Sequence, residues 1–177
     1  EKTSWSCHHG VKRWDRTCAC AEHGEWKHGM RLAFNRIAEY VDEEMQKALD
    51  PYGLQLQEFR NEYAYVLTGQ EKPLDQLRRL LGNGLTKSEE EKLLLLMQAQ
   101  YERQRMFTSC GWFFGDFERI EARNNLAYAA MAVYLLEEVT GNKDYYRKIH
   151  RALTHVVNET TGVRASTIFS NAFFWGN

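Results

Sequence analysis

The stretch Thr3–Cys20, with the sequence TSWSCHHGVKRWDRTCAC, contains residue types at a density that ordinary core packing does not require. These eighteen residues include three of the four cysteines, two of the six histidines and two of the five tryptophans of the chain. We therefore expect the beginning of the chain to form a specific structure around which the other residues are organised.

Four side chains in this stretch have the chemistry of a metal site. Cys7 and His9 form a C-x-H pair, and Cys18 and Cys20 form a C-x-C pair after eight further residues. Thiolate sulfur and imidazole nitrogen are the ligand types that tetrahedral zinc prefers. The loop between the pairs begins with a glycine, which allows the chain to turn back. The sequence therefore predicts a zinc site formed by these four residues, with the distant Cys110 as an alternative ligand.

Other interpretations of the cysteines stay open. Cysteine is often buried as a small apolar side chain, and this interpretation is favoured for Cys110. A disulfide framework is disfavoured, because a long helical chain does not need covalent staples and a C-x-C bridge closes a strained ring. A reactive-thiol site would use Arg13, Arg16 and the neighbouring histidines to lower a thiol pKa, but the chain has no C-x-x-C motif.

Two groups of motifs resemble a known domain family. TSWSCHHG, RW and CAC fall within residues 3–20, and TSCGWFFGD follows at residues 108–116. In this order they resemble the carboxy-terminal domain of unknown function that follows the catalytic domain in a subset of bacterial glycoside hydrolase family 57 proteins. The family pattern has CGC where this chain has CAC, so Ala19 replaces a glycine, and the segment from Cys20 to Trp26 is shorter than expected for the family.

The resemblance implies that this chain is a non-catalytic accessory domain of a carbohydrate-active protein. Its partner would be an amino-terminal family 57 catalytic domain, a glycoside hydrolase or glucanotransferase that acts on an α-glucan or a related polysaccharide. The catalytic residues would lie in that domain. No catalytic residue is therefore assigned to this chain.

The tryptophans support a second hypothesis, in which the chain is a carbohydrate-binding module. Trp5, Trp14 and Trp112 would offer flat faces on which sugar rings can stack, although tryptophans more often belong to a core. Exposed and coplanar indole rings would favour sugar binding, whereas buried rings would exclude it.

Composition narrows the classes of function. With 23 basic and 24 acidic side chains the net charge is −1, which argues against a nucleic-acid-binding protein. No apolar run approaches the roughly 18 residues that a membrane-spanning helix needs, and no secretion signal is recognisable. We expect a cytoplasmic protein, where thiols stay reduced. Because the chain lacks an initial methionine, we also expect it to be a piece of a longer multidomain protein.

The spacing of apolar residues predicts a helical fold. Only two prolines occur among the 177 residues, and after a loop at 21–29 apolar side chains recur every three or four residues from Met30 to Ala48, which is typical of an amphipathic helix. Similar patterns predict helices near 56–69, 73–81, 116–139 and 142–158, and Ser88 with Glu91 indicates the capped start of another. We predict a single all-α domain over residues 1–177, a bundle of about five to seven helices, with residues 1–28 as an irregular Cys/His-rich segment packed on it.

The second motif, around residues 106–116, is expected to contact the first. A break in the helix at Gly111 or Gly115 would let its aromatic residues pack on the amino-terminal motif and bring Cys110 near the other cysteines. Asp116, Glu118 and Glu121 follow; we attribute them to the favourable end of a helix dipole rather than to an acid and base for glycoside chemistry. The tail, residues 161–177, has no clear period, and its aromatic residues should cover a groove.

Overall fold

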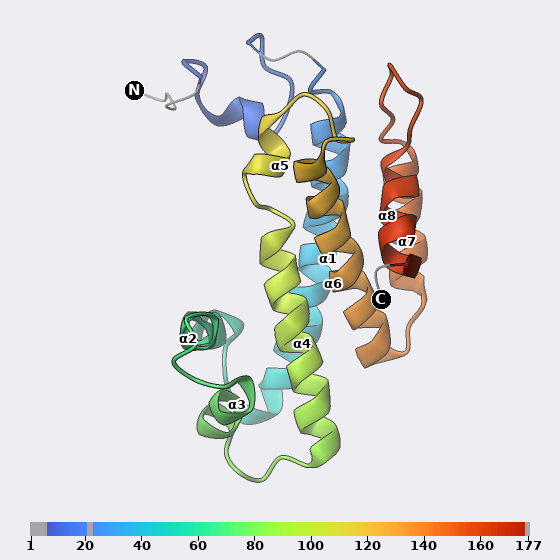
Figure 1. Ribbon diagram of the computed structural model, residues 1–177. Coiled ribbons are helices and arrows are strands. Elements are labelled where there is room, and N and C mark those ends of the chain that lie inside the picture. The colour runs from blue at the N-terminus through green and yellow to red at the C-terminus, as the bar shows by residue number, and fades with distance from the viewer. Residues whose placement is uncertain (1–6, 21–22, 176–177) are drawn as a thin grey trace.

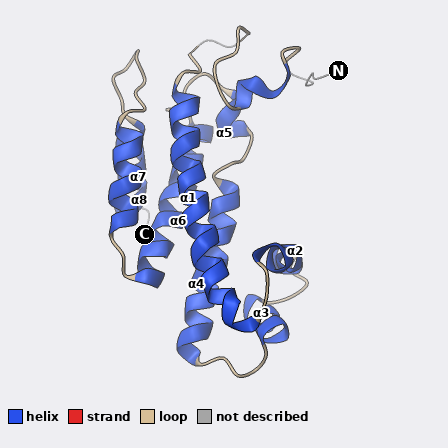
Figure 2. Ribbon diagram, turned by 180° about the vertical axis from the view of Figure 1, so that it is seen from behind, coloured by secondary structure: helices blue, strands red, loops and turns tan. Residues whose placement is uncertain are grey.

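The computed structural model describes residues 7–20 and 23–175, which are predominantly helical (Figure 1). The helices are η1 (Gly10–Trp14) and η2 (Asp50–Tyr52), both of the 3₁₀ type, and the α-helices α1 (Trp26–Leu49), α2 (Leu56–Leu67), α3 (Pro73–Leu81), α4 (Lys87–Arg105), α5 (Cys110–Phe113), α6 (Ile120–Thr140), α7 (Asp144–Thr154) and α8 (Ala165–Trp175). The described residues form isolated bridges but no named strand (Figure 2). The predicted all-α bundle is confirmed, because seven of these α-helices have nine or more residues.

Three long helices, α1, α4 and α6, pack together along the length of the molecule (Figure 1). Phe34, Leu96 and Leu126, one from each helix, are fully buried at their interface. Burial of each such side chain contributes about 1.5–3 kcal/mol. Helices α7 and α8 pack on this group, while α2 and α3 lie at the end of the bundle opposite residues 7–20 (Figure 1). The described helices therefore share one hydrophobic core.

Helix α1 confirms the predicted apolar stripe but begins earlier than expected. Met30, Phe34 and the other stripe residues up to Met45 are buried. The prediction of a loop through Gly29 is wrong, because the helix already begins at Trp26. A Cβ atom at Gly29 would lie 2.9 Å from the Val156 side chain, so this glycine permits close packing after α7. A helical glycine costs roughly 1 kcal/mol relative to alanine, but a larger residue here would clash with the Val156 side chain.

The start of α4 is capped by a different residue from the predicted one. Thr86, not Ser88, is the N-cap, and its hydroxyl accepts a hydrogen bond from the Glu89 backbone N–H at 3.3 Å. The Glu89 carboxylate accepts in return from the Thr86 backbone N–H at 2.8 Å. Both residues of the predicted S-x-x-E pair lie inside the helix, where a side chain no longer satisfies an unpaired backbone N–H.

Helix α6 begins at Ile120, four residues after its predicted start. Asp116 lies in the preceding turn, where its Oδ1 accepts a hydrogen bond from the Glu118 backbone N–H at 2.7 Å. Glu121 alone of the three acidic residues lies in the first helical turn. The helix ends at Thr140, and the C-cap residue Gly141 has a φ of +69°. The interpretation as dipole-favoured acidic groups therefore applies only to Glu121.

The tail forms helix α8, which was not among the predicted helices. Phe169 is fully buried, and its ring lies 5.9 Å from that of Tyr146 on α7. Phe173 contacts the same tyrosine at 4.5 Å. These aromatic residues cover a surface of this chain, as expected, although Phe174 remains 61% exposed. The expectation of no period is wrong, because Ala165, Ile168, Phe169, Ala172 and Phe173 recur every three or four residues while Thr167 and Asn171 are exposed.

Candidate metal centre

Cys7, His9, Cys18 and Cys20 lie together at one end of the bundle. Their ligand atoms, three Sγ and one ring nitrogen, are all within 4.8 Å of one another. The Sγ of Cys7 is 2.9 Å from that of Cys20 and 3.5 Å from that of Cys18, and the Cys18–Cys20 distance is 3.2 Å. The Nδ1 atom of His9 is 3.5 Å from the sulfurs of Cys7 and Cys18. The structure thus brings together the four residues that the sequence predicted.

These distances resemble the edges of a metal-binding tetrahedron. With Zn–S near 2.3 Å and Zn–N near 2.0–2.1 Å, a tetrahedral site has S–S edges of about 3.8 Å and S–N edges of about 3.5 Å. The sulfur–nitrogen distances from Cys7 and Cys18 to His9 equal this value, while all three sulfur–sulfur distances are shorter than a tetrahedral edge and would lengthen around an ion. The donor set and its geometry therefore fit one metal ion.

The protonation of the cysteine thiols depends on how close their sulfur atoms lie to one another. The pKa of Cys18 is lowered, chiefly because the Cys20 backbone N–H donates to its sulfur. The pKa of Cys20 is raised to about 11, chiefly because its thiol shares a hydrogen bond with the Cys7 sulfur. Three adjacent thiolates repel one another, so full ionisation requires a cation among them. A bound metal ion would supply that charge.

Two glycines shape the backbone around the group. Gly10 has a φ of +84°, which favours glycine, and its N–H donates to the Cys7 carbonyl at 3.1 Å. This turn returns the chain through η1 toward Cys18. A Cβ atom at Gly24 would lie only 3.1 Å from the Thr17 Cα atom. The chain before α1 therefore passes directly over the backbone beside the cysteines.

Residues 13 and 14 attach this segment to the aromatic second motif. The Arg13 guanidinium lies 4.0 Å from the centre of the Phe113 ring, and its Nε donates to the Phe113 carbonyl at 3.0 Å. The Trp14 ring lies 5.7 Å from the same phenylalanine ring. The predicted contact between the two motifs is therefore present, and it follows the break that ends α5 at Phe113.

Two basic residues of α1 support the same segment. Lys27 is fully buried, and its Nζ donates to the Arg13 carbonyl at 2.7 Å. Burial lowers the pKa of Lys27 to about 8. Arg31 donates to the Trp14 carbonyl at 2.7 Å and stacks 3.9 Å from the centre of the Trp112 ring. Sequence reasoning missed both residues, because a lysine and an arginine near the start of a helix give no signal of burial.

The TSCGW sequence, residues 108–112, lies in the connection between α4 and α6 and is held there by hydrogen bonds to α6. The Thr108 hydroxyl donates to Asn125 Oδ1 at 2.7 Å, and Asn125 Nδ2 donates to the Thr108 carbonyl at 3.0 Å. A Cβ atom at Gly111 would lie 2.3 Å from the Asn125 side chain. Asn125 thus holds the turn that presents α5 to the amino-terminal segment, and nothing in the sequence singled it out.

Cys110 does not join the cysteine group. The metal-ligand group within the described residues contains the other three cysteines and His9 only. Cys110 is exposed and lines an apolar hollow of about 260 Å³ with Trp14, Phe113 and Phe114. The expectation that the helix break would place Cys110 among the other cysteines is wrong, because its side chain projects into solvent on the first residue of α5. Its predicted burial as an apolar residue is wrong as well.

The residues considered for sugar chemistry are placed differently from what stacking or catalysis would require. Trp112 is fully buried, so its ring has no face available to a sugar, and Trp14 is half-buried against Phe113. Trp5 lies outside the described residues.

The carboxylates considered for catalysis are held by a neighbouring loop. Asn158 Nδ2 donates to Asp116 Oδ1 at 3.2 Å and to Glu118 Oε1 at 2.7 Å. This bridge attaches the loop before α8 to the start of α6.

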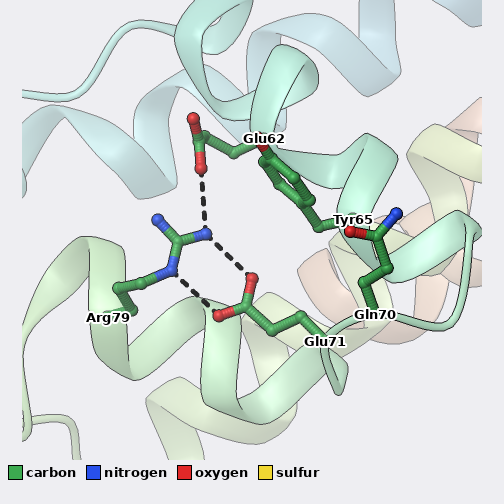
Figure 3. A pocket seen from close by; sticks show the side chains of 5 residues that line it. All are labelled: Glu62, Tyr65, Gln70, Glu71 and Arg79. Carbon is green, nitrogen blue, oxygen red and sulfur yellow. Dashed lines mark hydrogen bonds and ion pairs between the residues drawn. The ribbon is translucent and has the colours of Figure 1, made fainter.

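A hollow of about 410 Å³ lies between α2 and α3 (Figure 3), at the end of the bundle opposite residues 7–20 (Figure 1). Arg79 crosses it, with ion pairs of 2.9 Å to Glu62 and 2.8 Å to Glu71 (Figure 3). The Tyr65 side chain lies at its edge (Figure 3). The arginine connects α3 with α2 and with the turn that follows it, so we assign these polar groups a structural role.

The fold and the cysteine group define an all-α domain with a candidate four-residue metal centre. Residues 23–171 match the family described as "Domain of unknown function (DUF3536)", and the chain belongs to this family. The match begins after Cys20, so the candidate centre lies outside it. No curated protein and no solved structure matches the chain. None of the described helices is long and apolar enough to cross a membrane.

The family assignment confirms part of the resemblance seen in the sequence. The chain belongs to a domain family of unknown function. The connection with glycoside hydrolase family 57 is not part of that match and stays a prediction.

Proposed function

We propose that Cys7, His9, Cys18 and Cys20 bind a structural zinc ion that fixes the amino-terminal segment on the helical bundle. The observation that carries this proposal is the approach of four ligand atoms to within 4.8 Å of one another. Three sulfurs and one imidazole nitrogen are a common donor set for structural zinc. Hard cations such as magnesium and calcium prefer oxygen ligands and would not select this group.

The number of protein ligands favours a structural role over a catalytic one. Catalytic zinc sites keep one coordination position for water or substrate, whereas structural sites use four protein ligands. Cys7 and Cys18 are buried and Cys20 is exposed, so the ion would sit at the surface with its coordination complete. Zinc binding of this kind can supply roughly 10 kcal/mol. That energy is enough to order a segment with little apolar surface of its own.

The wider role follows from the resemblance alone. We propose that this family member is a non-catalytic accessory domain in a cytoplasmic, carbohydrate-active protein, next to a family 57 catalytic domain. A reducing cytoplasm would keep the thiols available for metal. The complete coding sequence tests this context directly. A family 57 catalytic domain is expected upstream of residue 1, and a complete protein without one would disprove the connection while leaving the zinc proposal intact.

The zinc proposal is tested by elemental analysis of the chain purified without chelator, together with a count of reactive thiols. We expect about one zinc ion per chain. In the same sample only the exposed Cys110 should react rapidly with a thiol reagent, and a chelator should expose the other three cysteines. A metal-free chain in which all exposed thiols react at once would refute the proposal. It would instead favour a reactive-thiol site, in which the hydrogen bonds that lower the pKa of Cys18 would favour its thiolate.

A further inference from the structure

A groove of about 460 Å³ lies between α1 and α7, away from the cysteine group. Close contacts bound the groove at both ends, one of them to Val156, which follows α7. At one end a Cβ atom on Gly29 would lie 2.9 Å from Val156, and at the other the rings of Tyr40 and Tyr145 are 4.9 Å apart. The surface between these contacts is formed by the apolar residues Leu32, Ala33, Ile149 and Ala152. Leu32 is 58% exposed, so part of this apolar surface faces solvent.

The charged side chains that line the groove are all basic. Arg36 from α1 and Lys148 from α7 stand on opposite sides, each 6.0 Å from the centre of the Tyr40 ring. His155 lines the opposite end. Arg36 also donates to Glu39 at 2.8 Å, but both side chains are more than half exposed, so exchanging this partner costs little. The Tyr40 end of the groove therefore carries two positive charges, and apart from His155 the rest of its lining has no ionisable side chain.

We infer that this groove binds a single-chain amphipathic anion of the long-chain carboxylate class. The carboxylate would lie between Arg36 and Lys148, and the hydrocarbon chain would cover the apolar surface beside Leu32. Gly29 and Tyr40 are eleven positions apart, which corresponds to about 16 Å along the helix. The volume falls within the range of small-molecule sites, about 300–1,000 Å³.

The arrangement of the charges argues for one head group rather than an acidic helix. Negative charges on a docked helix would recur along its length, and the groove would then need cations along its whole rim. The two cations of this groove, Arg36 and Lys148, instead both lie 6.0 Å from the centre of the Tyr40 ring, near one end. None of these residues belongs to the cysteine group, so this site is independent of the proposed zinc function.

The experiment is a calorimetric titration of the purified chain with laurate below its critical micelle concentration. Dodecanol and dodecyltrimethylammonium, which share the hydrocarbon chain, serve as the neutral and cationic probes. Laurate is expected to bind at least about tenfold more tightly than either, a difference of about 1.4 kcal/mol. The double variant Arg36→Gln with Lys148→Gln should lose this preference, and Leu32→Gln should weaken laurate and dodecanol alike.

Lys92→Gln is the matched control, because Lys92 is exposed on α4 and does not line the groove. It should bind laurate as the unchanged chain does. Equal binding of laurate and the cationic probe, or full laurate affinity in the double variant, would overturn the inference. Binding of an acidic amphipathic peptide in place of laurate would also overturn it and would identify the groove as a protein-docking site.

Discussion

Residues 7–20 and helix α1 are held in place by different forces. Only Cys7, Gly10 and Cys18 are buried in residues 7–20, whereas ten of the 24 residues of α1 are buried. Apolar burial stabilises the helix by many small contributions, but it cannot order a segment that buries two thiols and a glycine. The comparison indicates that the bundle folds through its core and that the amino-terminal segment depends on ligands and a few polar contacts.

The largest expected effect comes from removing one ligand. Cys18→Ser replaces a thiolate by a poor zinc ligand, so we expect zinc to be lost and residues 7–20 to become sensitive to protease. The helical content measured by far-UV circular dichroism should stay nearly unchanged, because the core does not include this segment's loop. Cys110→Ser is the control, since Cys110 lies outside the ligand group. Unchanged zinc content in Cys18→Ser would contradict the site.

Truncating a core side chain of α1 tests whether the helical bundle is stabilised by apolar burial. Phe34 is fully buried and contacts the rings of Phe107 and Trp112. Phe34→Ala should cost about 3–5 kcal/mol of unfolding free energy and lower the melting temperature by roughly 10 °C. Zinc stoichiometry of the folded fraction should remain at its original value. If Phe34→Ala released zinc while the helices stayed folded, the metal site of residues 7–20 would depend directly on the packing of α1, and the two regions would not be stabilised independently.

The turn that places α5 against the amino-terminal segment is sensitive to substitution at Gly111. A Cβ atom there would lie 2.3 Å from the buried Asn125 side chain. Gly111→Ala should therefore displace Asn125 from its hydrogen bonds with Thr108 and cost about 1–3 kcal/mol in urea unfolding. Gly84→Ala is the matched control, because nothing lies within 4 Å of a Cβ atom at Gly84. Similar midpoints for both variants would show that the turn tolerates the extra atom.

The sequence predicted the features that rest on one-dimensional patterns. The stripe from Met30 to Met45 determined the helix and its buried face, and the spacing of the cysteines indicated the ligand group. Both features are local, because helical period and loop closure act over short stretches of chain. The start of α1 was missed because the role of Gly29 depends on Val156, which lies far away in the sequence.

The supporting residues of the site could not be predicted for the same reason. Lys27 reaches the Arg13 carbonyl and Asn125 reaches Thr108 only after the helices have packed. Neither residue type favours burial, and their partners are identified only by the tertiary structure. The position of Cys110 was also undetermined, because a one-turn helix such as α5 has no periodic pattern that would orient its side chains.

Lys27 provides a test of how far the bundle supports the ligands. Its buried ammonium group stabilises negative charge on Cys18 and donates to the backbone of the ligand loop. Lys27→Met should lower zinc affinity by about tenfold or more, as expected for groups that orient metal ligands. Competition with a chromogenic chelator measures this affinity. Lys12→Met, at an exposed position of η1, should bind zinc as the unchanged chain does. If Lys27→Met and Lys12→Met bound zinc with equal affinity, Lys27 would contribute to packing and not to the metal site.

The smallest effect separates the observed cap of α4 from the predicted one. Thr86→Ala removes the acceptor for the Glu89 backbone N–H and should cost about 1 kcal/mol of unfolding free energy. Ser88→Ala should change it by only a few tenths of a kcal/mol, because alanine is the better helix former at an exposed position. Urea unfolding of the two variants gives the comparison. This cap lies at the end of the bundle opposite the cysteines (Figure 1), so the two variants should bind zinc with equal affinity. A difference in zinc affinity would show that destabilising one end of the bundle also weakens the ligand group at the other end.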